Sequence, residues 1–166
     1  MGACGVDRFV SNYSNRLDAK GRVSIPAPFR AILARDGHEG LFLYPSLDTA
    51  AVDCGGNALK QAIDDVLSRY SPYSEQWETL SVALYGASEV LKIDAEGRVV
   101  LSEMVRATAG ITTEVTFVGQ GHKFQIWEPS RFRARFEEAK LRLREVRQEL
   151  GSGYAAPAPR PPGARE

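Results

Sequence analysis

A nine-residue segment that occurs twice constrains the fold of this 166-residue chain more than any other feature. Residues 17–25 read Leu-Asp-Ala-Lys-Gly-Arg-Val-Ser-Ile, and residues 93–101 read Ile-Asp-Ala-Glu-Gly-Arg-Val-Val-Leu. The match continues at the same offset, where Phe-Arg-Ala at 29–31 corresponds to Val-Arg-Ala at 105–107. Because both copies lie in the same apolar frame, the chain is predicted to contain an internal repeat and two related halves.

Each copy predicts a strand, a tight loop, a return strand and a short helix. Asp18 and Arg22 flank a three-residue loop that ends in Gly21, where a type I turn closed by a left-handed residue favours glycine. Gly97 is the equivalent glycine in the second copy. Asp18 and its equivalent Asp94 are expected to accept backbone N–H bonds and so to shape the two hairpins.

Hydrophobic periodicity and punctuating glycines predict the elements around the repeat. The helix of each copy is expected to end at Gly37 or at Gly110. Strands are predicted over residues 40–44, 114–118 and 123–127, because these runs are rich in β-branched and aromatic side chains.

Two further helices are predicted between the copies. Asn57 is expected to cap the first helix, and Ser74 is expected to cap the second, which ends at Gly86. The first helix should present one apolar face, made of Leu59, Ile63, Val66 and Tyr70.

A long helix is predicted from about residue 130 to 150, followed by a disordered tail rich in Pro and Ala. Its apolar residues recur at alternating spacings of four and three, at Phe132, Phe136, Ala139, Leu143, Val146 and Leu150. This heptad spacing leaves a narrow stripe, called the seam below, that favours a contact between subunits. Packing of the seam on the same chain is the alternative.

The charged residues are balanced over the whole chain but unevenly distributed along it. The 21 Lys and Arg balance the 21 Asp and Glu, but residues 1–35 carry a net +4, residues 36–105 a net −8 and residues 106–166 a net +4. A folded chain with this distribution can present a basic face, although charge alone favours an ordinary solvated surface. No apolar run is long enough to cross a membrane, and the first residues do not resemble a secretory signal.

The few histidines and cysteines do not predict an active site. His38 and His122 lie in predicted turns, and neither has a second ligand at metal-binding spacing. Cys4 and Cys54 stand far apart, which is typical of a reducing, cytoplasmic setting. We therefore predict no catalytic residue, no metal, no cofactor and no small-molecule substrate. The basic residues at the hairpin tips, Lys20, Arg22 and Arg98, are instead placed for contacts with phosphate or guanine.

The two Asp-x-x-x-Arg motifs occur together with Leu-Tyr-Pro at 43–45, Val-Gly-Gln at 118–120 and Phe-Gln-Ile-Trp-Glu at 124–128. In this combination the chain resembles the bacterial MraZ family from Phe9 to Leu150. The resemblance implies an α+β fold in which two duplicated AbrB-like halves form a pseudo-symmetric split β-barrel with flanking helices. The implied organisation is a first half at 9–56, connecting helices at 57–86, a second half at 87–129, a C-terminal helix at 130–151 and a tail at 152–166.

The resemblance also implies a function. It implies a transcriptional repressor that is located at the nucleoid and forms a homo-oligomeric ring. The implied ligand is double-stranded DNA, bound at direct repeats upstream of the protein's own gene, within a division and cell-wall gene cluster. The DNA-contacting loop of the family falls on Lys20, Gly21 and Arg22, and Arg98 takes the same motif position in the second copy. The sequence departs from the family at Glu96, which replaces a basic loop residue, and at residues 48–56, which interrupt an expected helix.

Other interpretations use the same features differently. The barrel and the seam (Phe132, Phe136, Leu143 and Val146 foremost) would suit a scaffold or interaction protein that has no primary role in reading DNA. An antitoxin-like AbrB module that blocks a partner through its C-terminal segment is a further possibility. An enzyme is the least favoured, because no convergent polar groups are predicted.

Overall fold

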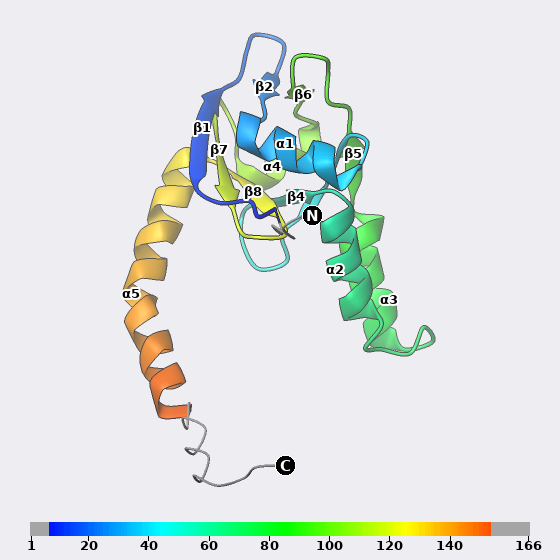
Figure 1. The fold of residues 1–166 in the computed structure, drawn as a ribbon, viewed down its shortest axis with the longest axis vertical. Coiled ribbons are helices and arrows are strands. Elements are labelled where there is room, and N and C mark those ends of the chain that lie inside the picture. The colour runs from blue at the N-terminus through cyan, green and yellow to red at the C-terminus, as the bar shows by residue number, and fades with distance from the viewer. Residues whose placement is uncertain (1–6, 154–166) are drawn as a thin grey trace, which may run out of the picture. The chain divides into compact units, whose positions relative to one another are not determined.

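The computed structural model describes residues 7–153, which adopt an α+β fold (Figure 1). The strands are β1 (Asn12–Arg16), β2 (Arg22–Ser24), β3 (Leu41–Pro45), β4 (Val52–Gly55), β5 (Glu89–Leu91), β6 (Arg98–Val100), β7 (Glu114–Gly119) and β8 (Phe124–Trp127). The helices are α1 (Ala27–Asp36), α2 (Asn57–Leu67), α3 (Glu75–Ser81), the π-helical turn η1 (Val82–Gly86), α4 (Glu103–Ala109) and α5 (Pro129–Gly153).

Six strands form one antiparallel sheet in the order β1-β7-β8-β4-β3-β5, and β2 pairs with β6 in a separate two-stranded ladder. The α+β class and the flanking helices agree with the prediction, but the larger sheet stays open, with β1 and β5 as its edges. It does not close into a barrel, because the return strands β2 and β6 pair with each other instead of extending it.

The strands on either side of each motif loop do not pair as hairpins, so that part of the prediction is wrong. β1 pairs with β7, whereas β2 pairs with β6, in the register Arg22↔Val100, Val23↔Val99 and Ser24↔Arg98. Burial explains the choice, because the β2–β6 pairing places both central valines, Val23 and Val99, in the core at 1% exposure each. Each loop is therefore closed by its own hydrogen bonds and not by a ladder.

The main core lies on the face of the sheet covered by α1 and α4. Phe29 of α1 packs between Phe9 and Phe124, with ring centroids 5.2 and 4.9 Å away, and burying each such side chain contributes about 1.5–3 kcal/mol. A smaller cluster fills the opposite face under α2 and η1, and it consists of Phe42, Tyr44, Leu59, Ile63, Leu67 and Leu84. Strand alternation separates the two clusters, because neighbouring residues of β3 point to opposite faces.

The helix ends follow the predicted capping residues, with one exception. Ser74 accepts the backbone N–H of the third helical residue, as predicted, and Ser102 does the same at the start of α4. Gly37 and Gly110 end their helices in the left-handed conformation. Asn57, in contrast, is the first residue of α2 and not its cap.

The cap of α2 comes from elsewhere in the chain. The Asp36 carboxylate, at the end of α1, accepts the backbone N–H bonds of Asn57 and Ala58. The predicted inner face of α2 is also shifted, because Leu67 is buried whereas Val66 and Tyr70 are exposed.

Helix α5 crosses the boundary between two compact units, one reaching Phe132 and the other beginning at Arg133. Its seam residues beyond Phe132 are exposed in the single chain, at Phe136, Leu143, Val146 and Leu150. Among the described residues, no helix is both long and apolar enough to cross a membrane. Ser152 and Gly153 belong to α5, and the rest of the predicted tail, 154–166, lies outside the described residues.

Candidate nucleic-acid interface

Loop 1, residues 18–22, is closed by backbone bonds at both of its ends. The Asp18 N–H donates to the Arg22 carbonyl at 2.9 Å, and the Gly21 N–H donates to the Asp18 carbonyl at 3.1 Å. Gly21 has a φ of 76°, the left-handed conformation that a side chain would strain. One carboxylate oxygen of Asp18 also accepts the N–H groups of Lys20 and Arg22, each at 2.9 Å.

Loop 2, residues 94–98, repeats these bonds atom for atom. The Asp94 N–H donates to the Arg98 carbonyl at 2.9 Å, and Gly97, with a φ of 78°, donates to the Asp94 carbonyl at 3.0 Å. The Asp94 carboxylate accepts the N–H groups of Glu96 and Arg98, each at 2.9 Å. The shared motif residues therefore fold two exposed loops into the same backbone conformation.

The N–H donors of each loop lower the pKa of its aspartate. The backbone N–H of Arg22 lowers the pKa of Asp18 below its usual value of 3.8, and the side chain of Arg22 and the N–H of Lys20 act in the same direction. The backbone N–H of Arg98 lowers the pKa of Asp94 in the same way. Each loop thus has a fixed negative charge under its tip.

The two loops differ in the charges that surround this shared backbone. In loop 1, Arg22 pairs with Asp18 (Nε–Oδ2, 2.6 Å), and the exposed Lys20 ammonium makes no ion pair with any described residue. In loop 2, Arg98 pairs with Asp94 (Nε–Oδ2, 3.1 Å) and also with Glu96 (Nη2–Oε2, 2.7 Å). Loop 1 therefore presents positive charge to solvent, whereas loop 2 neutralises its arginine internally.

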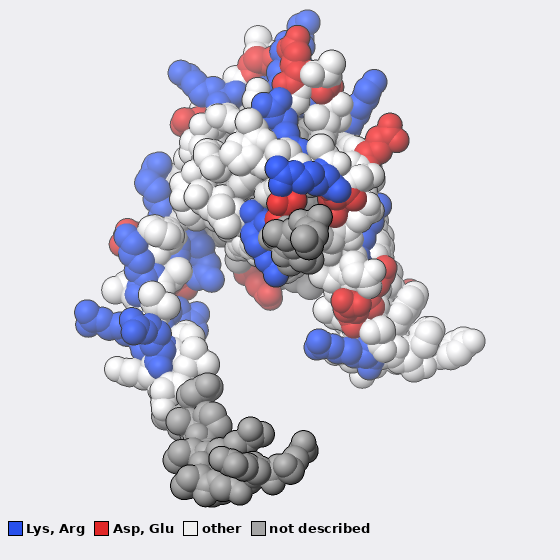
Figure 2. Space-filling view, viewed as in Figure 1, with Lys and Arg blue, Asp and Glu red and all other residues white. Residues whose placement is uncertain are grey.

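The ladder between β2 and β6 holds the two loops side by side (Figure 1). The Ile25 N–H donates to the Gly97 carbonyl at 3.0 Å, and the Leu101 N–H donates to the Gly21 carbonyl at 3.1 Å. Each return strand is thus tied to the other loop. Figure 2 shows basic and acidic side chains intermixed at this end of the molecule, where the loops lie in Figure 1.

Two arginines beside the loops were not predicted as site residues. Arg30, on α1, donates from Nη1 to the Glu96 carbonyl of loop 2 at 3.1 Å. Arg106, on α4, lies beside loop 1, with Nη1 3.8 Å from the position that a Cβ of Gly21 would occupy. The repeat alignment shows that these two arginines are equivalent, which is the sequence signal that could have identified them. Only the fold shows that each lies at the loop of the other copy.

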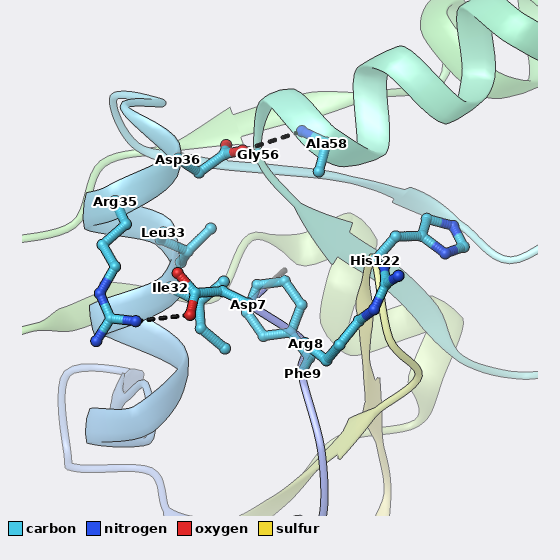
Figure 3. Close-up of a pocket in the computed structure, with 10 residues that line it drawn as sticks. All are labelled: Asp7, Arg8, Phe9, Ile32, Leu33, Arg35, Asp36, Gly56, Ala58 and His122. Atoms are coloured by element: carbon cyan, nitrogen blue, oxygen red, sulfur yellow. Dashed lines mark hydrogen bonds and ion pairs between the residues drawn. The ribbon is translucent and has the colours of Figure 1, made fainter. Parts of the chain in front are cut away.

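A separate depression of about 230 Å³ lies between α1, the start of α2 and the β7–β8 turn (Figure 3). Arg35 in its wall pairs with Asp7 at 2.6 Å, and Asp36 is occupied in capping α2. Burial lowers the pKa of His122, so this imidazole is mainly neutral near pH 7. The depression thus holds one Arg–Asp ion pair and a capping carboxylate, and its lining residues include no nucleophile paired with a base.

The described residues do not gather metal ligands or an activated thiol. They contain no group of three or more His, Cys, Asp or Glu side chains placed to hold an ion. Burial raises the pKa of the Cys54 thiol well above its usual value, which suppresses the reactive thiolate. The two loops are therefore the only chemistry-bearing feature predicted from sequence that the described structure brings together on one surface.

Comparison with known proteins gives consistent matches. A family model described as "MraZ protein, putative antitoxin-like" matches residues 83–150. Proteins named "Transcriptional regulator MraZ" from Beijerinckia indica and Methylocella silvestris are 62% and 60% identical, and each match covers 97% of this chain and 100% of the relative. The protein of that name from Parvibaculum lavamentivorans is 40% identical, with 96% of this chain and 100% of the relative covered.

Proposed function

The chain belongs to the MraZ family, as its motifs predicted, and we propose that it regulates transcription by binding double-stranded DNA through loop 1. The observation that carries this proposal is the pair of basic side chains, Lys20 and Arg22, on either side of Gly21 in a loop with a fixed backbone. A loop whose backbone is already fixed loses little backbone freedom when its cations contact an anionic surface.

Each residue of the loop has a distinct part in the proposed contact. Lys20 neutralises a phosphate, which positions the protein without reading sequence. Arg22 has a planar guanidinium able to bind the O6 and N7 atoms of guanine, which would specify the box. Gly21 has no side chain and lets the backbone approach the groove. Arg98 contributes more weakly, because two carboxylates already hold it.

A single loop offers few phosphate contacts, so one protomer binds DNA weakly and with a strong dependence on salt. In our proposal a homo-oligomeric ring, joined in part through the seam, presents several loops to direct repeats upstream of the protein's own gene. Simultaneous binding raises the effective concentration and supplies the affinity. The result is autorepression of a division and cell-wall gene cluster by a cytoplasmic protein at the nucleoid.

The strand order supports the finer fold assignment that we include in this proposal. Read from either end, β1-β7-β8-β4-β3-β5 begins with a strand that precedes one motif loop and continues with the two strands that follow the helix of the other copy. Two AbrB-like halves exchanging strands would give such an order, with boundaries near 9–56 and 87–129, joined by helices at 57–86 and followed by the C-terminal helix from 130.

The test is a fluorescence-anisotropy titration of a duplex from the region upstream of the protein's own gene, at several salt concentrations. A shuffled duplex of equal length and composition is the control. We expect tighter binding to the upstream duplex and a loss of that preference in Arg22→Ala. Equal affinity for both duplexes by the parent protein would contradict sequence-specific binding.

An antitoxin-like role is the second candidate, because the family description contains that word. The exposed apolar side chains of α5 are the surface that such a module would offer to a protein partner. The titration above separates the two roles, since an antitoxin-like module or a scaffold without a DNA-reading role would show no preference for the upstream duplex.

A further inference from the structure

We propose that Arg106 completes the DNA-contacting surface of loop 1 from the other half of the chain, while its repeat equivalent Arg30 holds loop 2 in place. This inference rests on the proposed function and adds a residue to its site. Both arginines follow their own motif by the same number of residues, and each reaches the loop of the other copy. Their equivalent positions make them a matched pair with different surroundings.

Arg30 is engaged in structural contacts. Its Nη1 donates to the Glu96 carbonyl, and its guanidinium fills the space beside Gly97 so closely that an added Cβ would overlap it. Its Nε atom is buried, without a hydrogen-bond partner among the described residues. A guanidinium packed against a glycine in this way fixes the shape of loop 2 and has little freedom to reach an external anion.

Arg106 has the opposite surroundings. Its side chain is exposed, and none of its guanidinium nitrogens makes a hydrogen bond or ion pair with the residues that the structure describes. Its Nη1 lies at ordinary van der Waals distance, 3.8 Å, from where a Cβ of Gly21 would be, so it borders the tip of loop 1 without holding it. The charge of Arg106 is therefore available to a phosphate that approaches this loop.

Because each arginine lies at the loop of the other copy, the two loop surfaces differ in formal charge. Loop 1 with Arg106 has three cations, Lys20, Arg22 and Arg106, against the carboxylate of Asp18, which gives a net +2. Loop 2 with Arg30 has two cations, Arg30 and Arg98, against Asp94 and Glu96, which gives a net charge of zero. A DNA backbone is attracted to the first surface and gains nothing from the second.

The experiment compares Arg106→Ala, Arg106→Lys and Arg30→Ala with the parent protein, and uses Arg69→Ala as a control for the loss of an exposed arginine remote from the loops. Anisotropy titrations of the upstream and shuffled duplexes give the slope of log K against log salt, and thermal unfolding gives Tm. Arg106→Ala should reduce the magnitude of the slope by about 0.9, the value for one phosphate contact, and should weaken binding to both duplexes equally.

Arg106→Lys should keep the slope because it keeps the charge, and neither Arg106 variant should lower Tm. Arg30→Ala should lower Tm and leave the slope unchanged. If the parent protein binds DNA and Arg106→Ala has the parent's slope, the inference is wrong and the proposed function stands. A fall in Tm as large in Arg106→Ala as in Arg30→Ala also overturns it. If the parent shows no DNA binding, the proposed function fails with it.

Discussion

In loop 1 and in loop 2 the same aspartate oxygen accepts the same two N–H groups, whereas the third residue is Lys20 in one loop and Glu96 in the other. Backbone bonds and the left-handed glycine are shared, so the Asp-x-x-x-Arg motif acts as a folding element in both copies. Each motif arginine is paired with its own aspartate, and the single charge reversal decides whether it has a cation beside it or is held by a second carboxylate. Fold and binding capacity are thus encoded at different positions of one motif.

The largest expected effect comes from removing the motif arginines one at a time. Arg22→Ala should cost about 1–3 kcal/mol per protomer and relax box specificity, because it removes a contact to a base edge. Arg98→Ala should cost less, and equally for all sequences. Anisotropy titrations of both variants on upstream and shuffled duplexes, with circular dichroism to verify folding, make the comparison. Equal losses would break the asymmetry between the loops.

A charge in the seam separates the contribution of the loops from that of assembly. Leu143→Asp should lower the oligomer mass and weaken binding to a duplex with several boxes roughly 100-fold or more, through lost avidity. Binding to a duplex with one box should hardly change, because loop 1 is intact. Light scattering gives the mass. An unchanged mass in a folded variant would remove the seam from the assembly.

Removing the aspartates tests the part of the motif that the loops share. Asp18→Ala and Asp94→Ala should each lower Tm to a similar extent, because each leaves two loop N–H groups without their acceptor. Calorimetry of both variants measures the change. A fall confined to one variant would show that the common backbone is not stabilised in a common way.

A smaller effect of the same origin should follow pH. The pKa values of Asp18 and Asp94 are lowered in the folded protein, so their stabilising contribution is complete above the unfolded value of 3.8 and is lost as pH falls through the lowered values. Tm should therefore fall between about pH 5 and pH 2, and fall less in the Asp18→Ala, Asp94→Ala double variant. Parallel curves of Tm against pH for the parent protein and the double variant would contradict this account.

Much of the local structure could be predicted because its causes are local. The loop glycines and the caps at Ser74 and Ser102 depend on residues within one turn of chain. Strand β4 was missed because Asp53 and Gly55 are poor strand formers, and it is stabilised by partners distant in sequence. Lys123 and Gln125 bind the buried Asp53 carboxylate at 2.8 and 2.6 Å.

The candidate site could likewise be predicted in part from the sequence. The charges of Lys20 and Glu96 can be read directly from the sequence, and so can the equivalence of Arg30 and Arg106. The crossing of these arginines to opposite loops could not be predicted, because it depends on β2 pairing with β6. That pairing joins residues 76 positions apart, Val23 with Val99, and it replaces the local hairpins that turn chemistry alone favours.

The central claim is that the charge of the third loop residue decides which loop binds DNA, and exchanging those charges tests it most directly. The Lys20→Glu, Glu96→Lys double variant keeps the composition, the net charge and both loop backbones. Arg22→Ala or Arg98→Ala is then added to this double variant. In the double variant the loss of Arg98 should weaken binding to the upstream duplex more, whereas in the parent protein the loss of Arg22 should weaken it more. If Arg22 remains the more important arginine after the exchange, the loop charge does not decide the binding site.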